Sequence, residues 1–417
     1  MSNAKVFIDF LGCKLNQAEA EKISYDLISR GYVLSKNVKD ADYYLLNSCA
    51  VTSVAEGKTR AKLARATRQN PQIKRILIGC CGQKDRQKYL NDGLAEYVFG
   101  NLDKYDFGEL LPSICDMPQG SQESILDRQR SFVSIQEGCA NHCSFCIVPL
   151  LRSTISCTPL LDVVSTIRDR INRGHFEITL TGTEIGAYRD GNDDLVSLVK
   201  NILNHTDVRR LRLSSLQPHE ITLPLLELFC DDERLLCPHF HMSLQSASDS
   251  VLQNMNRAYS MKQYEEALYK IWTALPNAAI TTDVIAGFPA ETEEDFRKTL
   301  EFCQKTPFAR VHVFSYSKRP GTNAARIDGH LSEQVKKKRS SLLLEVAQEK
   351  MINFAKKHMH TNVEVYVEGM RNGLYEGYTP DYLRVCFAAS QNLMGYTTNV
   401  YIKSVAHNGQ YAIGSLI

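Results

Sequence analysis

The chain reads Glu137-Gly138-Cys139-Ala140-Asn141-His142-Cys143-Ser144-Phe145-Cys146 directly after a short apolar stretch. The three cysteines have the spacing CxxxCxxC. Three thiolates from one tight loop can hold three irons of a four-iron cluster and leave the fourth iron open for a ligand. Zinc sites usually combine two ligands with a second, distant pair, so a lone triplet fits zinc poorly. We therefore expect Cys139, Cys143 and Cys146 to bind a [4Fe–4S] cluster.

A second set of cysteines is spread along the first part of the chain. Cys13, Cys49 and Cys80 each follow a short apolar segment, and each interval between them has the length of one strand–helix crossover. Because the carboxyl ends of parallel strands lie at one edge of a sheet, the three thiols are expected to converge there on a second cluster. Cys81 could replace Cys80 as the ligand. We favour Cys80 because a glycine precedes it, as one precedes Cys13.

The composition is that of a globular protein, with 43% hydrophobic and 23% charged residues among 417, a length that predicts two or three domains. No apolar run approaches the ~18 residues that a membrane-spanning helix needs, and the first residues do not form a signal peptide. We therefore expect a cytoplasmic protein with no membrane partner. The net charge of +2 means that any surface for nucleic acid must be local.

The cysteine count is informative because 13 is an odd number and the cytoplasm is reducing. Both points argue against a disulfide framework and favour metal or cluster ligation. The remaining cysteines show no ligand-like spacing and are interpreted as structural: Cys115, Cys157, Cys230, Cys237, Cys303 and Cys386.

The order of apolar and helix-like segments predicts an α/β protein. In the first domain, residues 1–118, alternation of the two predicts an open parallel α/β sheet. The expected strands are Val6–Leu11, Tyr43–Leu46 and Ile76–Ile78, and the expected helices are Ala18–Arg30 and Ala55–Gln69. A polar segment, residues 119–131, is expected to be a linker.

The second domain, residues 132–345, repeats the alternation and predicts a partial (β/α) barrel with its chemistry at the carboxyl ends of the strands. The expected strands are Ser131–Ile135, Glu177–Leu180, Arg210–Leu213, His239–Ser243, Ala279–Ile285 and Arg310–Phe314. A long helix, Ser332–His358, is expected to lead out of this domain. In the last part, residues 346–417, alternating apolar and polar residues predict a small antiparallel β-barrel after the helix.

Residues 57–75 contain seven basic residues and no acidic one. Lys58, Lys62 and Arg65 have helical spacing and can share one face, and Arg68 follows one turn later. A run of like charges is often simply a solvated surface, and that alternative stays open. The absence of acidic residues favours contact with the phosphates of a nucleic acid.

Three other polar features have plainer interpretations. His239 and His241 point to one face of a predicted strand, and we expect hydrogen bonds inside the barrel rather than metal binding. The run Lys336–Arg339 is expected to be helix surface. Asp283, at a strand end, is expected either to bind the ribose of a cofactor or to cap the next helix.

These motifs resemble the methylthiotransferase family of radical S-adenosylmethionine enzymes over nearly the whole chain. Beyond the six cysteines, the resemblance rests on Leu180-Thr181-Gly182, Leu213-Ser214-Ser215, Leu244-Gln245-Ser246, Asp283–Pro289 and Phe314–Thr322. It implies two [4Fe–4S] clusters, S-adenosylmethionine and a C-terminal TRAM-type barrel. It also implies that the Cys139–Cys146 cluster cleaves S-adenosylmethionine to a deoxyadenosyl radical, while the other cluster carries the sulfur that is transferred.

The resemblance further implies residues that lie near the cofactor: Phe145, Gly182, Glu184, Ser214, Gln245, Asp283 and Gly287. One of these positions departs from the family pattern, since asparagine is expected in place of Glu184; nearby, glycine is expected in place of Ala247. Arg152 is the one basic residue left in a stretch, residues 150–157, that is usually rich in arginine, and we expect it to contact tRNA. An electron donor such as flavodoxin or ferredoxin is implied as a second partner.

Gly12–Gln17 and Ser214–Pro218 are most similar to the branch that methylthiolates carbon 2 of threonylcarbamoyladenosine next to the tRNA anticodon. The alternatives are isopentenyladenosine of tRNA and an aspartate of a ribosomal protein. Outside the family, a zinc-dependent RNA-binding module without catalysis is the remaining alternative. No residue by itself identifies the pocket for the threonylcarbamoyl group, although Arg152, Arg257 or Arg319 could bind its carboxylate.

Overall fold

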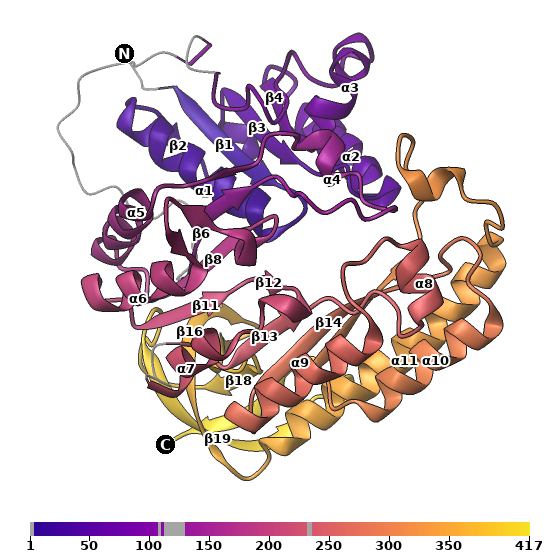
Figure 1. Cartoon of the computed structure of the whole chain (residues 1–417). Coiled ribbons are helices and arrows are strands. Elements are labelled where there is room, and N and C mark those ends of the chain that lie inside the picture. Colours follow the sequence, from indigo (N-terminus) through magenta and orange to yellow (C-terminus); the bar gives the residue numbers. More distant parts are fainter. Residues whose placement is uncertain (1–3, 107–109, 112–129, 232–235) are drawn as a thin grey trace.

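The computed structural model describes residues 4–106, 110–111, 130–231 and 236–417. The expected linker, 119–131, lies outside the described residues except for its last two positions. Three parts are arranged from top to bottom in Figure 1: a parallel sheet with helices, a larger arc of strands and helices, and a small barrel near the C-terminus. The α/β class expected from the sequence is confirmed.

The N-terminal domain is a five-stranded parallel sheet with the strand order β2-β1-β3-β4-β5. Its strands are β1 Lys5–Phe10, β2 Val33–Leu34, β3 Tyr43–Ser48, β4 Lys74–Gly79 and β5 Tyr97–Val98, and its helices are α1 Lys14–Ser29, α2 Ser53–Gln69 and α3 Cys80–Asn91. The three expected strands are confirmed, because their apolar residues, among them Val6, Leu45 and Ile78, form the core. The two short edge strands carry too few residues for a sequence pattern to show.

The middle domain is an open barrel of two four-stranded sheets with the orders β11-β8-β6-β7 and β12-β13-β14-β15. A parallel bridge between Leu211 and Leu236 connects them. The strands are β6 Arg130–Glu137, β7 Ser156–Cys157, β8 Glu177–Gly182, β11 Arg210–Leu213, β12 Ser215–Leu216, β13 His239–Met242, β14 Ala279–Ala286 and β15 Arg310–Ser315. All six expected strands are present, and the expectation of a partial barrel is confirmed.

Helices cover the outside of this arc and bury its apolar residues in one continuous core. They are α4 Val148–Leu151, α5 Leu160–Asn172, α6 Leu195–His205, α7 Leu223–Asp231, α8 Asp249–Asn254, α9 Met261–Ala274 and α10 Glu293–Lys305. Capping boxes begin α9, at Ser260 and Gln263, and α10, at Thr292 and Asp295. A small hairpin (β9 Arg189–Asp190, β10 Asp193–Asp194) and four short 3₁₀ turns (Val38–Asp40, Ile185–Ala187, Pro218–Glu220, Asn323–Arg326) complete the connections.

The long helix α11, Glu333–Lys357, runs beside β15 and α10 before the chain enters the C-terminal barrel. The domain boundary expected after residue 345 therefore falls inside a helix that packs on the middle domain. The barrel is closed in the order β16-β17-β18-β20-β19. Its strands are β16 Asn362–Arg371, β17 Leu374–Tyr378, β18 Arg384–Ala388, β19 Thr397–Val405 and β20 Ala412–Leu416.

Helix α1 joins the N-terminal domain to the middle domain. It packs against β6 and β8 as well as against its own sheet. The carboxylate of Glu21 accepts hydrogen bonds from the Ser131 hydroxyl and from the Phe132 amide, each at 2.9 Å. This contact is buried, so the amino end of α1, which carries Cys13, has a defined place at the barrel.

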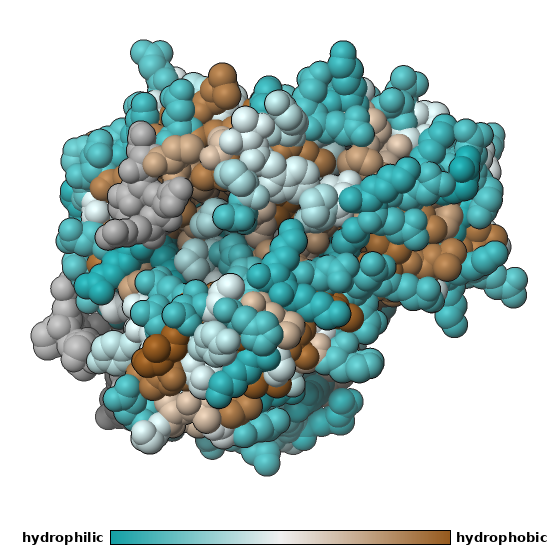
Figure 2. Space-filling view, turned by 90° about the horizontal axis from the view of Figure 1, so that it is seen from below, coloured by the Kyte–Doolittle hydropathy of each residue, from teal (hydrophilic) through white to brown (hydrophobic). Residues whose placement is uncertain are grey.

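The surface seen from below is mostly hydrophilic, and its hydrophobic side chains form small, separate areas (Figure 2). Among the described residues, we find no helix whose length and hydropathy would allow it to cross a bilayer.

Candidate active site

The first three cysteines meet at the carboxyl edge of the N-terminal sheet. Cys13 precedes α1, Cys49 follows β3 and Cys80 opens α3. Gly12 has a φ of +119°, and a Cβ atom there would lie 2.6 Å from the Cβ of Cys49. Glycine is therefore needed before Cys13 both for the backbone conformation and for the close approach of Cys49.

The electrostatics of these thiols show that they share one site. Burial raises the pKa of the Cys49 thiol to about 12, and the neighbouring charges of Cys13 and Cys80 act in the same direction. Burial also raises the pKa of Cys13. Thiols held together in this way release protons when they bind metal, which fits a cluster with three protein ligands.

Cys81 lies next to this site, but its thiol points elsewhere. It donates to the carbonyl of Cys49 at 3.2 Å and lies 3.6 Å from the Thr59 hydroxyl. The Cys80 sulfur lies 3.6 Å from the side-chain amide nitrogen of Asn101. The negative charge of Cys80 raises the pKa of the Cys13 thiol. This geometry favours Cys80 over Cys81, in line with the expectation from the repeated glycine.

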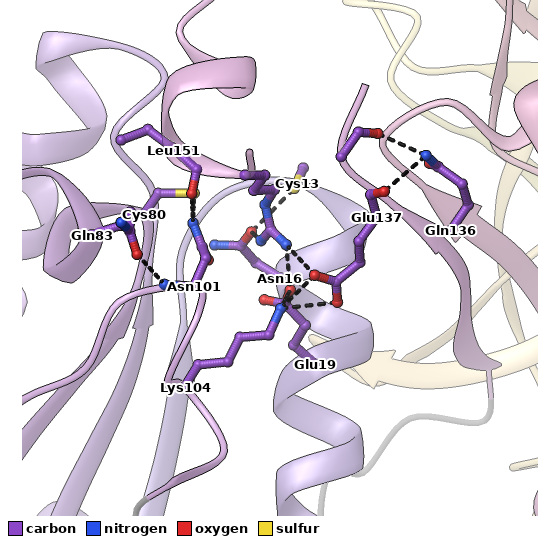
Figure 3. Close-up of polar contacts among 12 residues, drawn as sticks. Cys13, Asn16, Glu19, Cys80, Gln83, Asn101, Lys104, Gln136, Glu137 and Leu151 are labelled. Carbon is purple, nitrogen blue, oxygen red and sulfur yellow. Dashed lines mark hydrogen bonds and ion pairs between the residues drawn. The ribbon is translucent and has the colours of Figure 1, made fainter. Parts of the chain in front are cut away.

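A buried network of ion pairs lies beside Cys13 (Figure 3). The Lys104 ammonium is 2.6 Å from the Glu19 carboxylate and 2.8 Å from Glu137. The Arg152 guanidinium is 2.6 Å from the same oxygen of Glu19 and 3.3 Å from Glu137. Since Glu137 ends β6, directly before the Gly138-Cys139 turn, the network connects the two cysteine sites.

The expectation that Arg152 contacts tRNA is wrong for this structure. Its side chain is buried, with 4% exposure, and its charge is matched by two carboxylates. Burial alone would lower the pKa of Arg152, but Glu19 raises it well above its usual value. A permanent cation therefore lies beside Cys13, where it opposes the effect of burial on that thiol.

The second cysteine triplet occupies the loop after β6. Its neighbours are polar: the Glu184 carboxylate is 3.2 Å from the Cys139 sulfur, and the Arg257 guanidinium donates to the Cys143 sulfur at 3.1 Å. Burial raises the pKa of Cys139 to about 12 and that of Cys146 to about 11. Three thiols on one loop, with a cation and a carboxylate at hand, fit a cluster that also binds an amino acid cofactor.

A cavity of about 640 Å³ lies where the three domains meet. Cys13 and Lys14 of the N-terminal domain line one side. The middle domain contributes residues from along its strands, with Gly182 and Ser214 at the carboxyl ends of β8 and β11 and His239 and Arg310 at the amino ends of β13 and β15. The C-terminal barrel closes it with residues 378 and 381–384. No sequence pattern indicated this last contribution, because the loop after β17 has no motif of its own.

The histidines of β13 hydrogen-bond inside the barrel, as expected. His239 and His241 both contact the Thr281 hydroxyl, at 3.1 and 2.9 Å. Asp283 accepts from His241 at 3.2 Å and from Ser243 at 3.3 Å. It lines the cavity and does not cap α10, whose N-cap is Thr292, so the capping alternative for Asp283 is wrong.

The other residues expected near the cofactor do not form one cluster in the structure. Glu184 is beside Cys139, while Phe145 packs on a small core that includes Phe288. Gln245 has a φ of +64° and its backbone pairs with β14. Gly287, with a φ of +76°, lies against the side chain of Lys336, which a Cβ atom would meet at 2.4 Å.

The basic segment on α2 is only partly free. Lys58, Arg65 and Arg68 are exposed, whereas the Lys62 ammonium is 2.6 Å from the Asp9 carboxylate. The expectation that Lys336–Arg339 is helix surface is wrong for two of its residues. Lys337 and Lys338 are exposed, but Lys336 and Arg339 are buried.

Arg257 and Arg319 were two of the arginines that could bind the carboxylate of the substrate, but both side chains contact other residues of the protein. Arg257 contacts Cys143 and Gln217, and Arg319 pairs with Glu56.

Comparisons with known proteins agree with this site. Residues 5–100 match the Uncharacterized protein family UPF0004, and residues 133–303 match the Radical SAM superfamily. The threonylcarbamoyladenosine tRNA methylthiotransferase MtaB of Thermotoga maritima is 33% identical over 97% of this chain and 95% of its own. The tRNA-2-methylthio-N(6)-dimethylallyladenosine synthase of Thermodesulfovibrio yellowstonii is 31% identical over 91% and 90%.

Among solved structures, the radical S-adenosylmethionine methyltransferase TsrM from Kitasatospora setae matches 99% of this chain and 84% of its own, with a TM-score of 0.52 and 11% identity. That likeness concerns the fold alone. The open barrel with its cysteine loop defines a radical S-adenosylmethionine enzyme, which uses this cofactor and a [4Fe–4S] cluster. Within that class, the chain belongs to the tRNA methylthiotransferase family, and it is a transferase.

Proposed function

We propose that this enzyme adds a methylthio group to carbon 2 of threonylcarbamoyladenosine next to the anticodon of tRNA. The observation that carries the proposal is the shared cavity, which Cys13 and the strands of the open barrel line together. Carbon 2 of adenine has an unactivated C–H bond with no acidic proton for a general base to remove. Radical chemistry is therefore required, and the fold class provides it.

Two clusters would be held by this chain, one by Cys139, Cys143 and Cys146 and one by Cys13, Cys49 and Cys80. When bound, the first supplies the electron that cleaves S-adenosylmethionine, and the second supplies the sulfur. A small electron-transfer protein such as flavodoxin or ferredoxin would deliver the electron. Glu184, 3.2 Å from the Cys139 sulfur, would hold the cofactor's ammonium group, and Arg257, which donates to the Cys143 sulfur, would stabilise the charge on that thiolate.

A base in a single-stranded anticodon loop can leave its stack more easily than a paired one, which allows it to enter the cavity. Phe314 lines the cavity and keeps 45% of its surface exposed. An exposed ring of this kind can stack on a base. Tyr378 and Tyr382 face the cavity from the C-terminal barrel, so that barrel would contact the substrate near the reacting base as well as the tRNA outside it.

The choice of threonylcarbamoyl over isopentenyl rests on the motif at Gly12–Gln17 and on the names of the relatives quoted above, which include both kinds. The test is turnover by the purified, reconstituted enzyme on tRNA that carries each modification in turn. We expect methylthiolated product from threonylcarbamoyladenosine. Turnover on isopentenyladenosine alone would overturn the branch and leave the reaction type standing.

The tRNA is expected to bind through the exposed face of α2 that carries Lys58, Arg65 and Arg68. Changing Lys58 and Arg65 to glutamate should weaken tRNA binding and reduce the slope of log affinity against log salt by about 2, because two phosphate contacts are lost. Binding measured over a salt series checks this. The same charge change at Lys262 and Lys305, which are 85% and 79% exposed on α9 and α10, is the matched control. If both variants had the same slope of log affinity against log salt, the basic segment would be a solvated surface and not a tRNA contact.

A further inference from the structure

Two cations that line the cavity have no hydrogen-bond or ion-pair partner among the residues that the structure describes. Lys14 is the first residue of α1 and Arg310 the first of β15, and both line the cavity. Neither side chain makes a hydrogen bond or an ion pair with any residue in the described parts of the chain. Both are partly buried, so neither is simply a surface cation whose charge bulk water fully solvates.

The remaining charges of the cavity wall are satisfied within the protein. Asp283 accepts from His241 and Ser243, and Asp381 accepts from His358 at 2.7 Å. Arg384 pairs with Glu376. Neither Lys14 nor Arg310 forms an ion pair with a described carboxylate. The negative charge of Asp283 offsets one of these two cations, so this part of the wall keeps a net positive charge, which favours an anionic ligand.

The two cations lie near the same point of the cavity. Both of their charges act on His312, whose pKa burial lowers to about 4. This imidazole is thus neutral and remains available as a hydrogen-bond partner. An anion placed between Lys14 and Arg310 would meet two cations and one neutral polar ring, with the Asp283 carboxylate within 4.8 Å of that ring as an opposing charge.

The position of Lys14 relates this anion site to the reacting atom. Lys14 directly follows Cys13, a proposed ligand of the cluster that supplies sulfur. In adenine, carbon 2 and carbon 6 flank the same ring nitrogen, so a substituent on N6 lies along the same edge as carbon 2. When carbon 2 faces Cys13, the N6 substituent consequently lies close to the neighbouring residue.

We propose that Lys14 and Arg310 bind the carboxylate of the threonylcarbamoyl group on the substrate base. The assignment rests on the proposed function and extends it to the atoms that recognise the modification. An isopentenyl group carries no charge, so it would displace water from the two cations and give them no partner. A site built for a charged group rejects the neutral analogue strongly for this reason.

The test compares two anticodon stem-loops that differ in one group: threonylcarbamoyladenosine as the free acid, and the same nucleoside with that carboxylate converted to a primary amide. For the wild-type enzyme, kcat/KM for the amide should be roughly 10- to 100-fold lower, the effect of losing a charge-assisted hydrogen bond. In the Lys14→Met variant, kcat/KM for the acid should fall by a similar factor. The ratio of kcat/KM for the acid to that for the amide should then approach one. Stem-loop affinity, measured by fluorescence anisotropy, should show the same loss of discrimination.

Arg310→Met provides a second variant on β15, outside the N-terminal cluster domain, should Lys14→Met disturb cluster assembly. Iron content is measured for both. Lys22→Met, which removes an exposed cation from the same helix α1, is the matched control and should keep the acid-to-amide ratio of the wild type.

An unchanged ratio in both cavity variants would overturn the assignment. Equal losses on acid, amide and unmodified stem-loops would do so as well, because they would identify a contact to backbone phosphate. Wild-type turnover on isopentenyladenosine alone would overturn the proposed function, and the assignment with it, before any variant is made.

Discussion

A Cys13→Ala variant is expected to lose methylthio transfer completely while it still forms deoxyadenosine from S-adenosylmethionine. Cys13 lines the cavity and shares its site with Cys49 and Cys80, whereas the cofactor-cleaving chemistry belongs to the loop after β6. Loss of one of three thiolate ligands should remove the N-terminal cluster or its sulfur, and the other loop should remain intact.

The measurement is product analysis of one reaction, with deoxyadenosine and methylthiolated nucleoside quantified together. Cys230→Ala is the matched control, because Cys230 is an exposed thiol that belongs to neither cysteine site. Methylthiolated product from the Cys13 variant would contradict the division of labour between the two sites. Loss of deoxyadenosine in that variant would show instead that the sites are not independent.

The triple variant Cys139→Ala, Cys143→Ala and Cys146→Ala should retain about half of the wild-type iron and form no deoxyadenosine. The reason is that, under the proposed function, these thiols would hold one of two four-iron clusters, and Cys13, Cys49 and Cys80 lie on a different domain. Iron analysis and absorption spectra after anaerobic reconstitution check this. A wild-type protein with only about four irons per chain would show that the Cys13, Cys49 and Cys80 site is wrong.

Much of the fold follows from local patterns. The strands that carry the chemistry are short apolar runs, and each of the expected ones lies where the structure has a strand. The convergence of Cys13, Cys49 and Cys80 could be predicted because parallel strands place their carboxyl ends at one edge. The preference for Cys80 over Cys81 followed from a repeated glycine and stays a prediction; the Cys81 thiol donates to the Cys49 carbonyl.

Other features depend on contacts between distant segments. Arg152 looked like a surface cation, but Glu19, 133 positions away, pairs with it in the interior. Arg339 likewise pairs with Glu291 of the loop before α10, and no helical pattern within α11 reveals that partner.

The wall of the cavity also depends on contacts between distant segments. Tyr382 lies in the loop between β17 and β18, has a φ of +76° and reaches the cavity from the C-terminal barrel. The predicted C-terminal barrel therefore forms part of the cavity wall. Its position depends on packing among three domains, which no local sequence pattern encodes.

The central claim, methylthiolation of threonylcarbamoyladenosine in tRNA, is tested most directly by nucleoside mass spectrometry of tRNA from cells that lack this protein. The account predicts that 2-methylthio-threonylcarbamoyladenosine disappears, that its precursor accumulates, and that the wild-type gene but not a Cys139→Ala variant restores the product. An unchanged amount of the methylthiolated nucleoside, or the loss of a methylthiolated isopentenyladenosine in its place, would contradict it.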